Sequence, residues 1–194
     1  MVGAGIVLAG ALVFLTLQRP PPLSFNITPP MVREAGDTLN GPLTITIDAR
    51  AEAGWSFFDF SRSSVVDRPG SLDWDLAVRR FRIIVNGGPG FAGVSGVLAL
   101  ADTAFDRVQE APADGYVRSA VLRGDSVNEA LLKWYDYGFT SHILSPKPRV
   151  YVLRTADGRF AKFEILGYYC PGATPGCLTI RYVYQGSGTP NFQP

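Results

Sequence analysis

Apolar and polar side chains alternate along much of the chain after residue 42, which is the pattern of half-buried β-strands. In the first such segment Leu43, Ile45 and Ile47 share one face, and polar residues lie between them. Strands outnumber helices and do not alternate with them, so the pattern predicts a mainly antiparallel β fold rather than βαβ units. Further segments with this alternation are residues 80–85, 149–154, 160–166 and 178–184.

The orientation of one strand can be predicted residue by residue. Residues 155–159 contain an Asp-Gly pair, which favours the left-handed conformation of a hairpin turn. On the arm that follows, Ala161, Phe163 and Ile165 are expected to face the core, with Lys162 directed outward.

One or two short helices are also predicted. Ser126 followed three residues later by Glu129 is a capping box, and an apolar run at residues 130–132 comes directly after it. A second short turn of helix is expected at residues 103–108.

Residues 1–18 are predicted to form a transmembrane helix. Residues 2–17 carry no charge, and as a helix they would extend about 24 Å, close to the thickness of the bilayer core. A secretory signal peptide is the alternative, but no Lys or Arg precedes the apolar run and no Ala-x-Ala cleavage site follows Val13. We therefore expect an uncleaved single-pass anchor that contacts the lipid bilayer through residues 2–17. Gly5 and Ala9 have the small-xxx-small spacing that lets another helix pack closely, although both residue types are common in membrane helices.

Residues 19–42 are predicted to be a proline-rich linker, because the prolines at 20–22 cannot continue a helix and favour a stiff extended spacer. Residues 43–194 then form the antiparallel β domain.

The side of the membrane on which the domain lies depends on two opposed signals. Arg19, taken with the positive-inside rule, favours the cytoplasm. Cys170 and Cys177 favour the other side, because they enclose a turn-rich Pro-Gly-Ala-Thr-Pro-Gly loop suited to a disulfide, and disulfides persist in oxidising compartments. We expect a bacterial membrane protein with its globular domain in the periplasm.

Composition excludes several classes of function. The chain has 18 basic and 17 acidic residues and a formal charge of +1, so it is not expected to bind nucleic acid. A single His and two Cys cannot supply a zinc site, and no metal site is predicted.

No catalytic constellation emerges, and the chain is predicted not to be an enzyme. Residues 88–93 match G-x-G-x-x-G, but a weak helix start follows them and no βαβ unit surrounds them. Ser95 lies in Gly-Val-Ser-Gly-Val, which lacks the last glycine of a nucleophile elbow. Asp73 and Asp75 can share one side of a strand as a carboxylate pair, an arrangement that is more commonly a solvated face.

His142, the only imidazole, leaves three roles open: axial haem ligand, pH-sensitive contact or ordinary hydrogen-bonded residue.

Several further segments stand out by their sequences. They are Trp-Ser-Phe-Phe-Asp-Phe at 55–60, Asp-Trp-Asp-Leu-Ala-Val-Arg-Arg at 73–80, Asn-Gly-Gly at 86–88, Tyr-Val-Leu-Arg-Thr-Ala-Asp-Gly at 151–158, Ala-Lys-Phe at 161–163 and Tyr-Val-Tyr-Gln at 182–185. Together, over residues 43–186, they resemble the HmuY-like family of exported haem-binding proteins. The resemblance implies a mostly antiparallel β domain, attachment to the outer membrane through a lipidated cysteine, and haem held by two axial His or Met side chains. This chain has no lipobox cysteine and no evident second ligand beside His142.

These departures lead to the expected function. A scaffold that lacks the ligand pair and carries a membrane helix favours a non-enzymatic accessory subunit, without a cofactor, that braces or links parts of a larger integral-membrane protein complex. A bacterial photosynthetic reaction centre with light-harvesting rings is one such complex. The alternative is a haem-binding HmuY-like protein that uses His142 as an axial ligand.

Overall fold

The computed structural model of the chain describes residues 21–31 and 33–193. In this part of the chain, no helix combines the length and apolar character that crossing a bilayer requires. The predicted transmembrane helix at 1–18, with its packing residues Gly5 and Ala9, lies outside the described residues.

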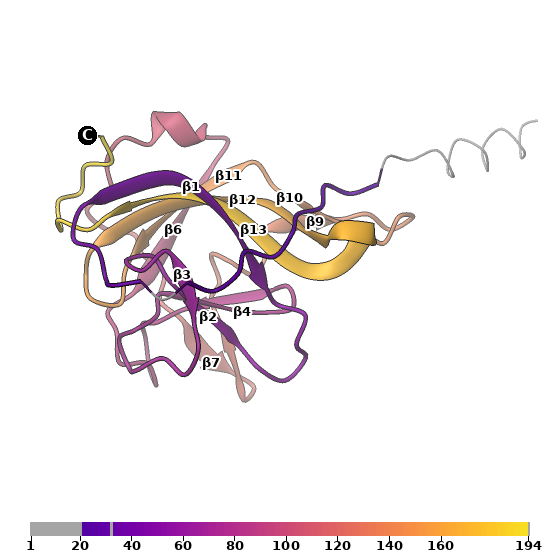
Figure 1. Cartoon of the computed structure of the whole chain (residues 1–194), viewed down its shortest axis with the longest axis horizontal. Coiled ribbons are helices and arrows are strands. Elements are labelled where there is room, and N and C mark those ends of the chain that lie inside the picture. Colours follow the sequence, from indigo (N-terminus) through magenta and orange to yellow (C-terminus); the bar gives the residue numbers. More distant parts are fainter. Residues whose placement is uncertain (1–20, 32, 194) are drawn as a thin grey trace, which may run out of the picture.

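The domain is built from two antiparallel sheets, and two smaller hairpins are attached to them (Figure 1). The larger sheet has the strand order β1-β13-β12-β11-β6, and the smaller has the order β3-β2-β4-β5. The mainly antiparallel β fold predicted from the alternation is thus confirmed. The strands are β1 (Leu39–Asp48), β2 (Ser56–Asp59), β3 (Ser64–Val66), β4 (Leu76–Arg79), β5 (Arg82–Val85), β6 (Gly96–Ala101), β7 (Ala120–Leu122), β8 (Asp125–Val127), β9 (Tyr135–Tyr137), β10 (Leu144–Pro146), β11 (Arg149–Arg154), β12 (Phe160–Cys170) and β13 (Thr174–Gln185).

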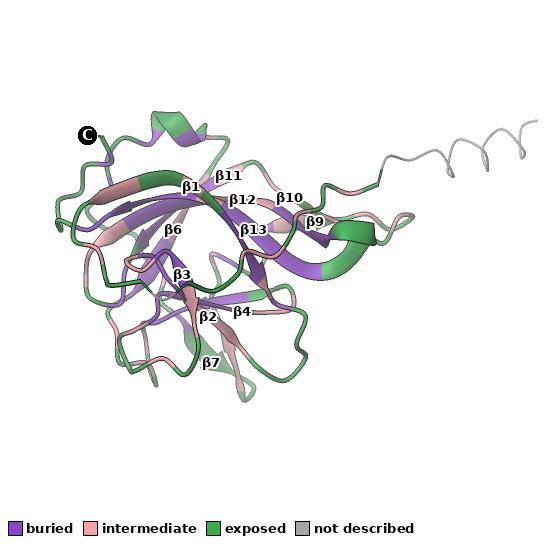
Figure 2. Ribbon diagram, in the orientation of Figure 1, coloured by how far each residue is buried: buried purple, intermediate pink, exposed green. Residues whose placement is uncertain are grey.

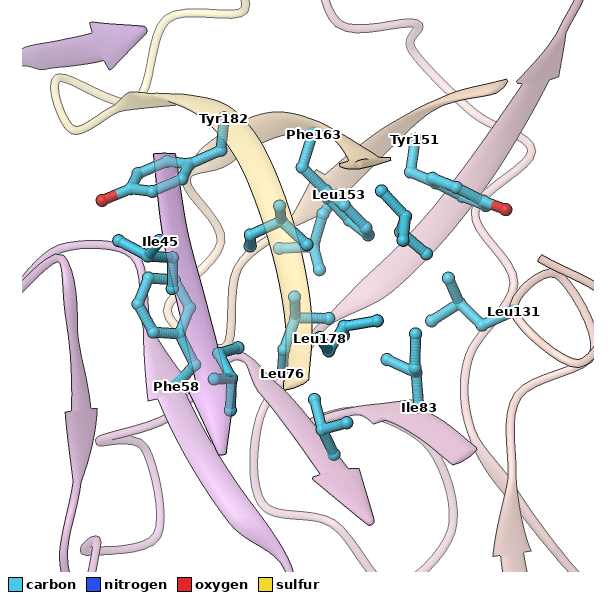
Figure 3. Packing of buried hydrophobic residues seen from close by; sticks show 14 of the residues in the cluster. Ile45, Phe58, Leu76, Ile83, Leu131, Tyr151, Leu153, Phe163, Leu178 and Tyr182 are labelled. Atoms are coloured by element: carbon cyan, nitrogen blue, oxygen red, sulfur yellow. The ribbon is translucent and has the colours of Figure 1, made fainter. Parts of the chain in front are cut away.

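The main core fills the space between the two sheets (Figure 3). Because side chains alternate along a strand, every second residue in the first half of β12 enters this core, and these are Ala161, Phe163 and Ile165, as predicted. After a register shift, the adjacent Tyr168 and Tyr169 also join the core. Buried residues appear on the inner strands of both sheets, whereas the outlying hairpins are largely exposed or intermediate (Figure 2).

A second cluster covers the opposite face of the five-stranded sheet. It includes Val150 and Val152 of β11, and Phe105 from the short 3-10 turn η1 (Phe105–Arg107), close to where a helical turn was expected. Lys162 lies on this face as predicted, but it is buried rather than solvated. Its ammonium donates hydrogen bonds to the carbonyls of Phe105 and Val108 at 3.1 and 2.7 Å.

The helix predicted from the capping box at Ser126 does not form. Ser126 lies in β8, which pairs with β7. The side chain of Asn128 accepts a hydrogen bond from the Ala130 N–H at 3.1 Å, and this Asx-type turn takes the place of a helix start. Strand pairing and this local turn satisfy the backbone groups on which the capping box would have acted.

The segment predicted as a spacer lies along the domain. The Phe25 N–H donates to the Tyr169 carbonyl at 2.9 Å, and the Thr28 N–H donates to the Thr46 carbonyl at 3.0 Å. β1 begins at Leu39, inside the predicted linker. The prolines keep this segment extended, and backbone carbonyls of the domain accept hydrogen bonds from the N–H groups of Phe25 and Thr28.

Candidate ligand-binding site

A cavity of about 510 Å³ opens between the β4–β5 hairpin, the β7–β8 hairpin and the segment that leads into β9. Small-molecule sites are typically concave, about 300–1,000 Å³ in volume, and mostly apolar with a few placed polar groups. This cavity has that character, and its apolar walls are formed by Phe81, Ile83, Leu122, Leu131, Leu132 and Tyr135. Another cavity, of about 650 Å³, lies beside β3 and is lined by the exposed Asp48–Arg50 ion pair without any aromatic residue.

Contacts between distant segments hold the walls of the cavity in place. The indole N–H of Trp134, whose side chain is fully buried, donates to the Phe81 carbonyl at 2.8 Å. Arg79 of β4 pairs with Asp125 of β8 at 2.8 Å, and Arg82 pairs with the same carboxylate. The three walls therefore form one structure, although they come from three parts of the sequence.

The mouth of the cavity exposes an unusual amount of apolar surface. Phe81, Leu122 and Leu132 are 43%, 58% and 48% exposed. Most of the large hydrophobic side chains exposed within the described residues lie at this cavity or on the neighbouring hairpins. Grouped exposed hydrophobic side chains mark a surface that binds something apolar.

The rim of the cavity carries an excess of positive charge. Arg82 and Arg123 line it, and Arg79 lies just behind. Arg79 and Arg82 both contact the carboxylate of Asp125. The three positive charges of the arginines therefore exceed its single negative charge. An apolar ligand with anionic groups at its edge matches this distribution.

His142 lies in the loop of the β9–β10 hairpin. The loop is closed by hydrogen bonds from the Gly138 N–H to the Ile143 carbonyl at 2.9 Å, and from the His142 N–H to the Gly138 carbonyl at 2.7 Å. His142 has a φ of 56°, a left-handed conformation in which His is enriched over most residues. Its Nδ1 is hydrogen-bonded to the Tyr137 hydroxyl. The pairing holds the ring and leaves Nε2 available to a ligand.

The cavity and His142 are connected by one face of β9. Tyr135 and Tyr137 are two residues apart in this strand, so their side chains lie on the same side, about 7 Å apart along it. Tyr135 lines the cavity, and Tyr137 contacts His142. His142 itself does not line the cavity. Its ring contacts Tyr137, which also packs against the 85% exposed Phe139.

The other residues singled out in the sequence have structural positions. Cys170 and Cys177 form a disulfide across the turn between β12 and β13. Ser95 is fully buried and donates to the Arg154 carbonyl at 2.6 Å. The carboxylate of Asp75 is buried and accepts N–H bonds rather than pairing with Asp73 at a surface. Among the described residues, no group of three or more His, Cys, Asp or Glu side chains is placed to hold a metal ion.

The walls of the site carry almost no signal in the sequence. Leu122, Leu132 and Arg123 gave no motif, and only the Arg-Gly pair at 123–124 hinted at the tight β7–β8 turn. The contact between Tyr137 and His142 depends on the conformation of the hairpin loop, which alternation does not encode.

One comparison with known proteins shows the family of the chain. A family model described as "HmuY protein" matches residues 51–182. A search of curated proteins finds no match.

Similar solved structures support the same fold. A Bacteroides vulgatus protein assigned as an HmuY-like haem-binding protein is 24% identical, with a TM-score of 0.60, covering 78% of this chain and 98% of that one. The apo HmuY analogue of Tannerella forsythia is 18% identical, with a TM-score of 0.59, covering 74% of this chain and 95% of that one. A Bacteroides fragilis protein assigned as a lipoprotein is 20% identical, with a TM-score of 0.57, covering 73% of this chain and 88% of that one.

These findings correct the expected function. The prediction of a structural subunit that braces a membrane complex, such as a photosynthetic reaction centre, is wrong, because the family match and the similar structures are HmuY-type proteins. The lack of an evident ligand pair in the sequence does not exclude the family, because the family match covers residues 51–182. The alternative, haem binding with His142, fits the comparisons better.

Proposed function

The chain belongs to the HmuY family, and from that premise we propose that it binds haem at the cavity beside β9, with His142 of the adjoining β9–β10 loop as an axial ligand. The observation that carries the proposal is the exposed apolar cavity with its cationic rim, connected by one face of β9 to the only imidazole of the chain.

The chemistry of the site matches that of haem. The flat, apolar ring would lie against the aliphatic and aromatic walls formed by Phe81, Leu122 and Leu132. The two propionates would lie near Arg82 and Arg123 at the rim. This division between an apolar face and charged edge groups is the reason to favour haem over a fully apolar ligand.

His142 is prepared for ligation by its hydrogen bond to Tyr137. A neutral imidazole that coordinates through Nε2 keeps its proton on Nδ1, from which it donates to the Tyr137 oxygen. The Tyr137 hydroxyl thus fixes the orientation of the ring, and it can accept the Nδ1 proton when Nε2 coordinates. In this proposal Tyr137 is a positioning residue, and His142 is the residue that touches the ligand.

The proposal is of a binding protein, not an enzyme, that works outside the cytoplasm. The Cys170–Cys177 disulfide supports an oxidising compartment. The Bacteroides fragilis relative assigned as a lipoprotein supports export of this fold. Haem capture at a cell surface or in a periplasm is consistent with both.

A haem titration followed by the Soret band tests the proposal. His142→Asn keeps a residue suited to the left-handed conformation and removes the imidazole, so we expect haem affinity to fall by at least about 100-fold with the fold intact. Ser141→Ala, in the same loop, is the control and should bind like the natural chain. Tyr137→Phe is expected to weaken binding by about 10–100-fold, which is typical for loss of a partner that orients a metal ligand.

The cavity itself is tested by Leu132→Glu, which places a negative charge on the apolar wall. The matched control is Leu72→Glu, because Leu72 is 50% exposed, much like Leu132 at 48%, but lies away from the cavity. Haem affinity should fall only in Leu132→Glu. Equal affinity in both variants would rule out the cavity as the haem site.

A further inference from the structure

One end of the domain is built from three segments that contain no charged residue. They are residues 21–31, 137–146 and 165–180, none of which includes Asp, Glu, Lys or Arg. The first runs along the domain before β1, the second forms the tip of the β9–β10 hairpin, and the third contains the turn between β12 and β13. Surfaces that meet only water normally carry charges of both signs, so this uncharged end needs an explanation.

Direct contacts hold the three segments together. The Phe25 N–H donates to the Tyr169 carbonyl at 2.9 Å, and the Tyr169 hydroxyl accepts a hydrogen bond from the Leu144 N–H at 2.8 Å. All three segments also line one small cavity, of about 170 Å³. In Figure 1 the indigo N-terminal segment, the β9–β10 hairpin and the turn after β12 accordingly lie at the same end of the domain.

Large apolar side chains project from this uncharged end. Phe139, in the loop of the β9–β10 hairpin, is 85% exposed, and Leu23 is 73% exposed. Tyr137 is 43% exposed, and its ring packs edge-on against that of Phe139 with centroids 5.4 Å apart. None of these three residues lines the cavity proposed for haem. The end therefore presents a second apolar surface, separate from the proposed site.

The charged side chains that border this surface include two ion pairs. Asp136 and Lys147, just outside the uncharged tip of the hairpin, pair at 3.3 Å. Asp48 and Arg50, beside the turn after β12, pair at 2.7 Å. Because these charges lie outside the three segments, the surface itself can leave water without stripping the hydration from an ion.

The sequence before residue 21 favours a lipid bilayer as the partner of this surface. Residues 2–17 carry no charge and are predicted to insert in the membrane. Only a few residues separate them from Leu23, and even a fully extended chain from residue 17 to residue 23 spans no more than about 20 Å. A bilayer that holds residues 2–17 is therefore within reach of the end that carries Leu23 and Phe139, and no other end of the domain is attached to it so closely.

We infer that this end of the domain docks on the surface of the bilayer, with Phe139 and Leu23 in the interfacial layer of the lipids. Aromatic and aliphatic side chains on an uncharged surface suit that layer, where apolar groups are buried among the headgroups and the first acyl carbons. The inference goes beyond the proposed haem binding and does not depend on it. It gives the β9–β10 hairpin a second role, which is to fix the orientation of the domain on the membrane.

The test uses the full chain reconstituted in vesicles made of equal parts of phosphatidylcholine and phosphatidylglycerol. Both natural cysteines are in the disulfide, so an introduced cysteine is the only free thiol and can carry an environment-sensitive fluorophore. Phe139→Cys and Leu23→Cys place the fluorophore at the docking end. Leu72→Cys is the control, because Leu72 is also an exposed leucine, at 50%, but lies in the loop before β4 in the smaller sheet. All three positions are exposed, so the substitutions should leave the fold intact.

Lipids that carry a nitroxide near the headgroup show which fluorophore meets the bilayer. Quenching at positions 139 and 23 should be at least about 3-fold stronger than at position 72, as expected for side chains in the interfacial layer. Equal quenching at positions 139 and 72 would overturn the inference. A blue-shifted emission at position 139 that these lipids do not quench, and that grows with the density of protein, would show contact between copies of the chain and would equally overturn it.

The failure of this inference can be told apart from the failure of the proposed function, because no haem is added. Quenching at position 139 in a chain that binds no haem would leave the membrane surface and remove the proposed function. Haem binding that depends on His142, without quenching at position 139, would do the reverse.

Discussion

Asp75 allows the sharpest prediction about stability. Its carboxyl group is buried just before β4. It accepts hydrogen bonds from the Phe60 N–H at 3.0 Å and the Ala156 N–H at 2.8 Å. Burial raises the pKa of Asp75 from 3.8 to about 7, and the nearby charge of Asp59 adds to the rise, whereas the two N–H bonds oppose it. Below about pH 7 the carboxyl group is therefore mostly protonated in the folded protein.

The sign of the pH dependence follows from this shift. The folded state binds a proton more tightly than the unfolded state, so the stabilisation is complete below about pH 4 and is lost as the pH rises through about 7. Moving the pKa from 3.8 to about 7 corresponds to about 4 kcal/mol in the free energy of unfolding, as an order of magnitude. Above about pH 7 the buried, ionised carboxylate therefore lowers the free energy of unfolding by about this amount relative to acid pH.

Asp75→Asn removes the titration and keeps the shape of the side chain. Its amide has only one oxygen, so its NH₂ group faces one of the two backbone N–H donors, which then has no acceptor. This loss lowers the free energy of unfolding by about 1–3 kcal/mol at every pH. We therefore expect the variant to be less stable than the natural chain at pH 4, and the difference to narrow or reverse by pH 8.

Urea unfolding followed by tryptophan fluorescence, at pH values from 4 to 8, measures this difference. The control is Asp73→Asn, which removes a neighbouring carboxylate whose side chain is 49% exposed. A changed dependence of the free energy of unfolding on pH is expected only in Asp75→Asn, because, of these two carboxylates, only that of Asp75 is buried. A difference between Asp75→Asn and the natural chain that stays constant across this pH range would refute the reasoning.

Three further predictions concern the disulfide, the second cluster and the rim of the site. Replacing Cys170 and Cys177 by Ser should lower the free energy of unfolding by about 2–3 kcal/mol, since the bond closes a short loop, and denaturant melts with and without reductant would measure it. Lys162→Met removes the ammonium that donates to the Phe105 and Val108 carbonyls and leaves both without this donor. The free energy of unfolding is therefore expected to fall by about 1–3 kcal/mol in the same assay, and an unchanged denaturation midpoint would contradict this. Arg123→Ala should weaken haem binding by about 2- to 5-fold, as for a partly exposed ion pair, while Arg107→Ala, away from the cavity, leaves the titration unchanged.

The strands could be predicted because alternation depends on local sequence alone. Ala161, Phe163 and Ile165 enter the core as the pattern requires, since one face of β12 covers it. The capping box at Ser126 failed because pairing between β7 and β8 outweighed a local signal. Burial of Lys162 was also missed, because the turn that covers it comes from residues more than 50 positions away.

The candidate site was only partly predictable for a related reason. His142 stood out because the composition contains a single imidazole. Its hydrogen bond to Tyr137 depends on the loop that closes the hairpin. The cavity walls come from segments joined by contacts such as the Trp134 indole with the Phe81 carbonyl, and no pattern within one segment predicts such a contact.

The central claim is that haem lies at the cavity beside β9, with the imidazole of His142 on the iron. A crystal structure of the full chain saturated with haem addresses it most directly. The account predicts the ring against Leu122 and Leu132, and Nε2 of His142 at the metal. Haem seated beside Met31, or held without any contact to His142, would contradict the account.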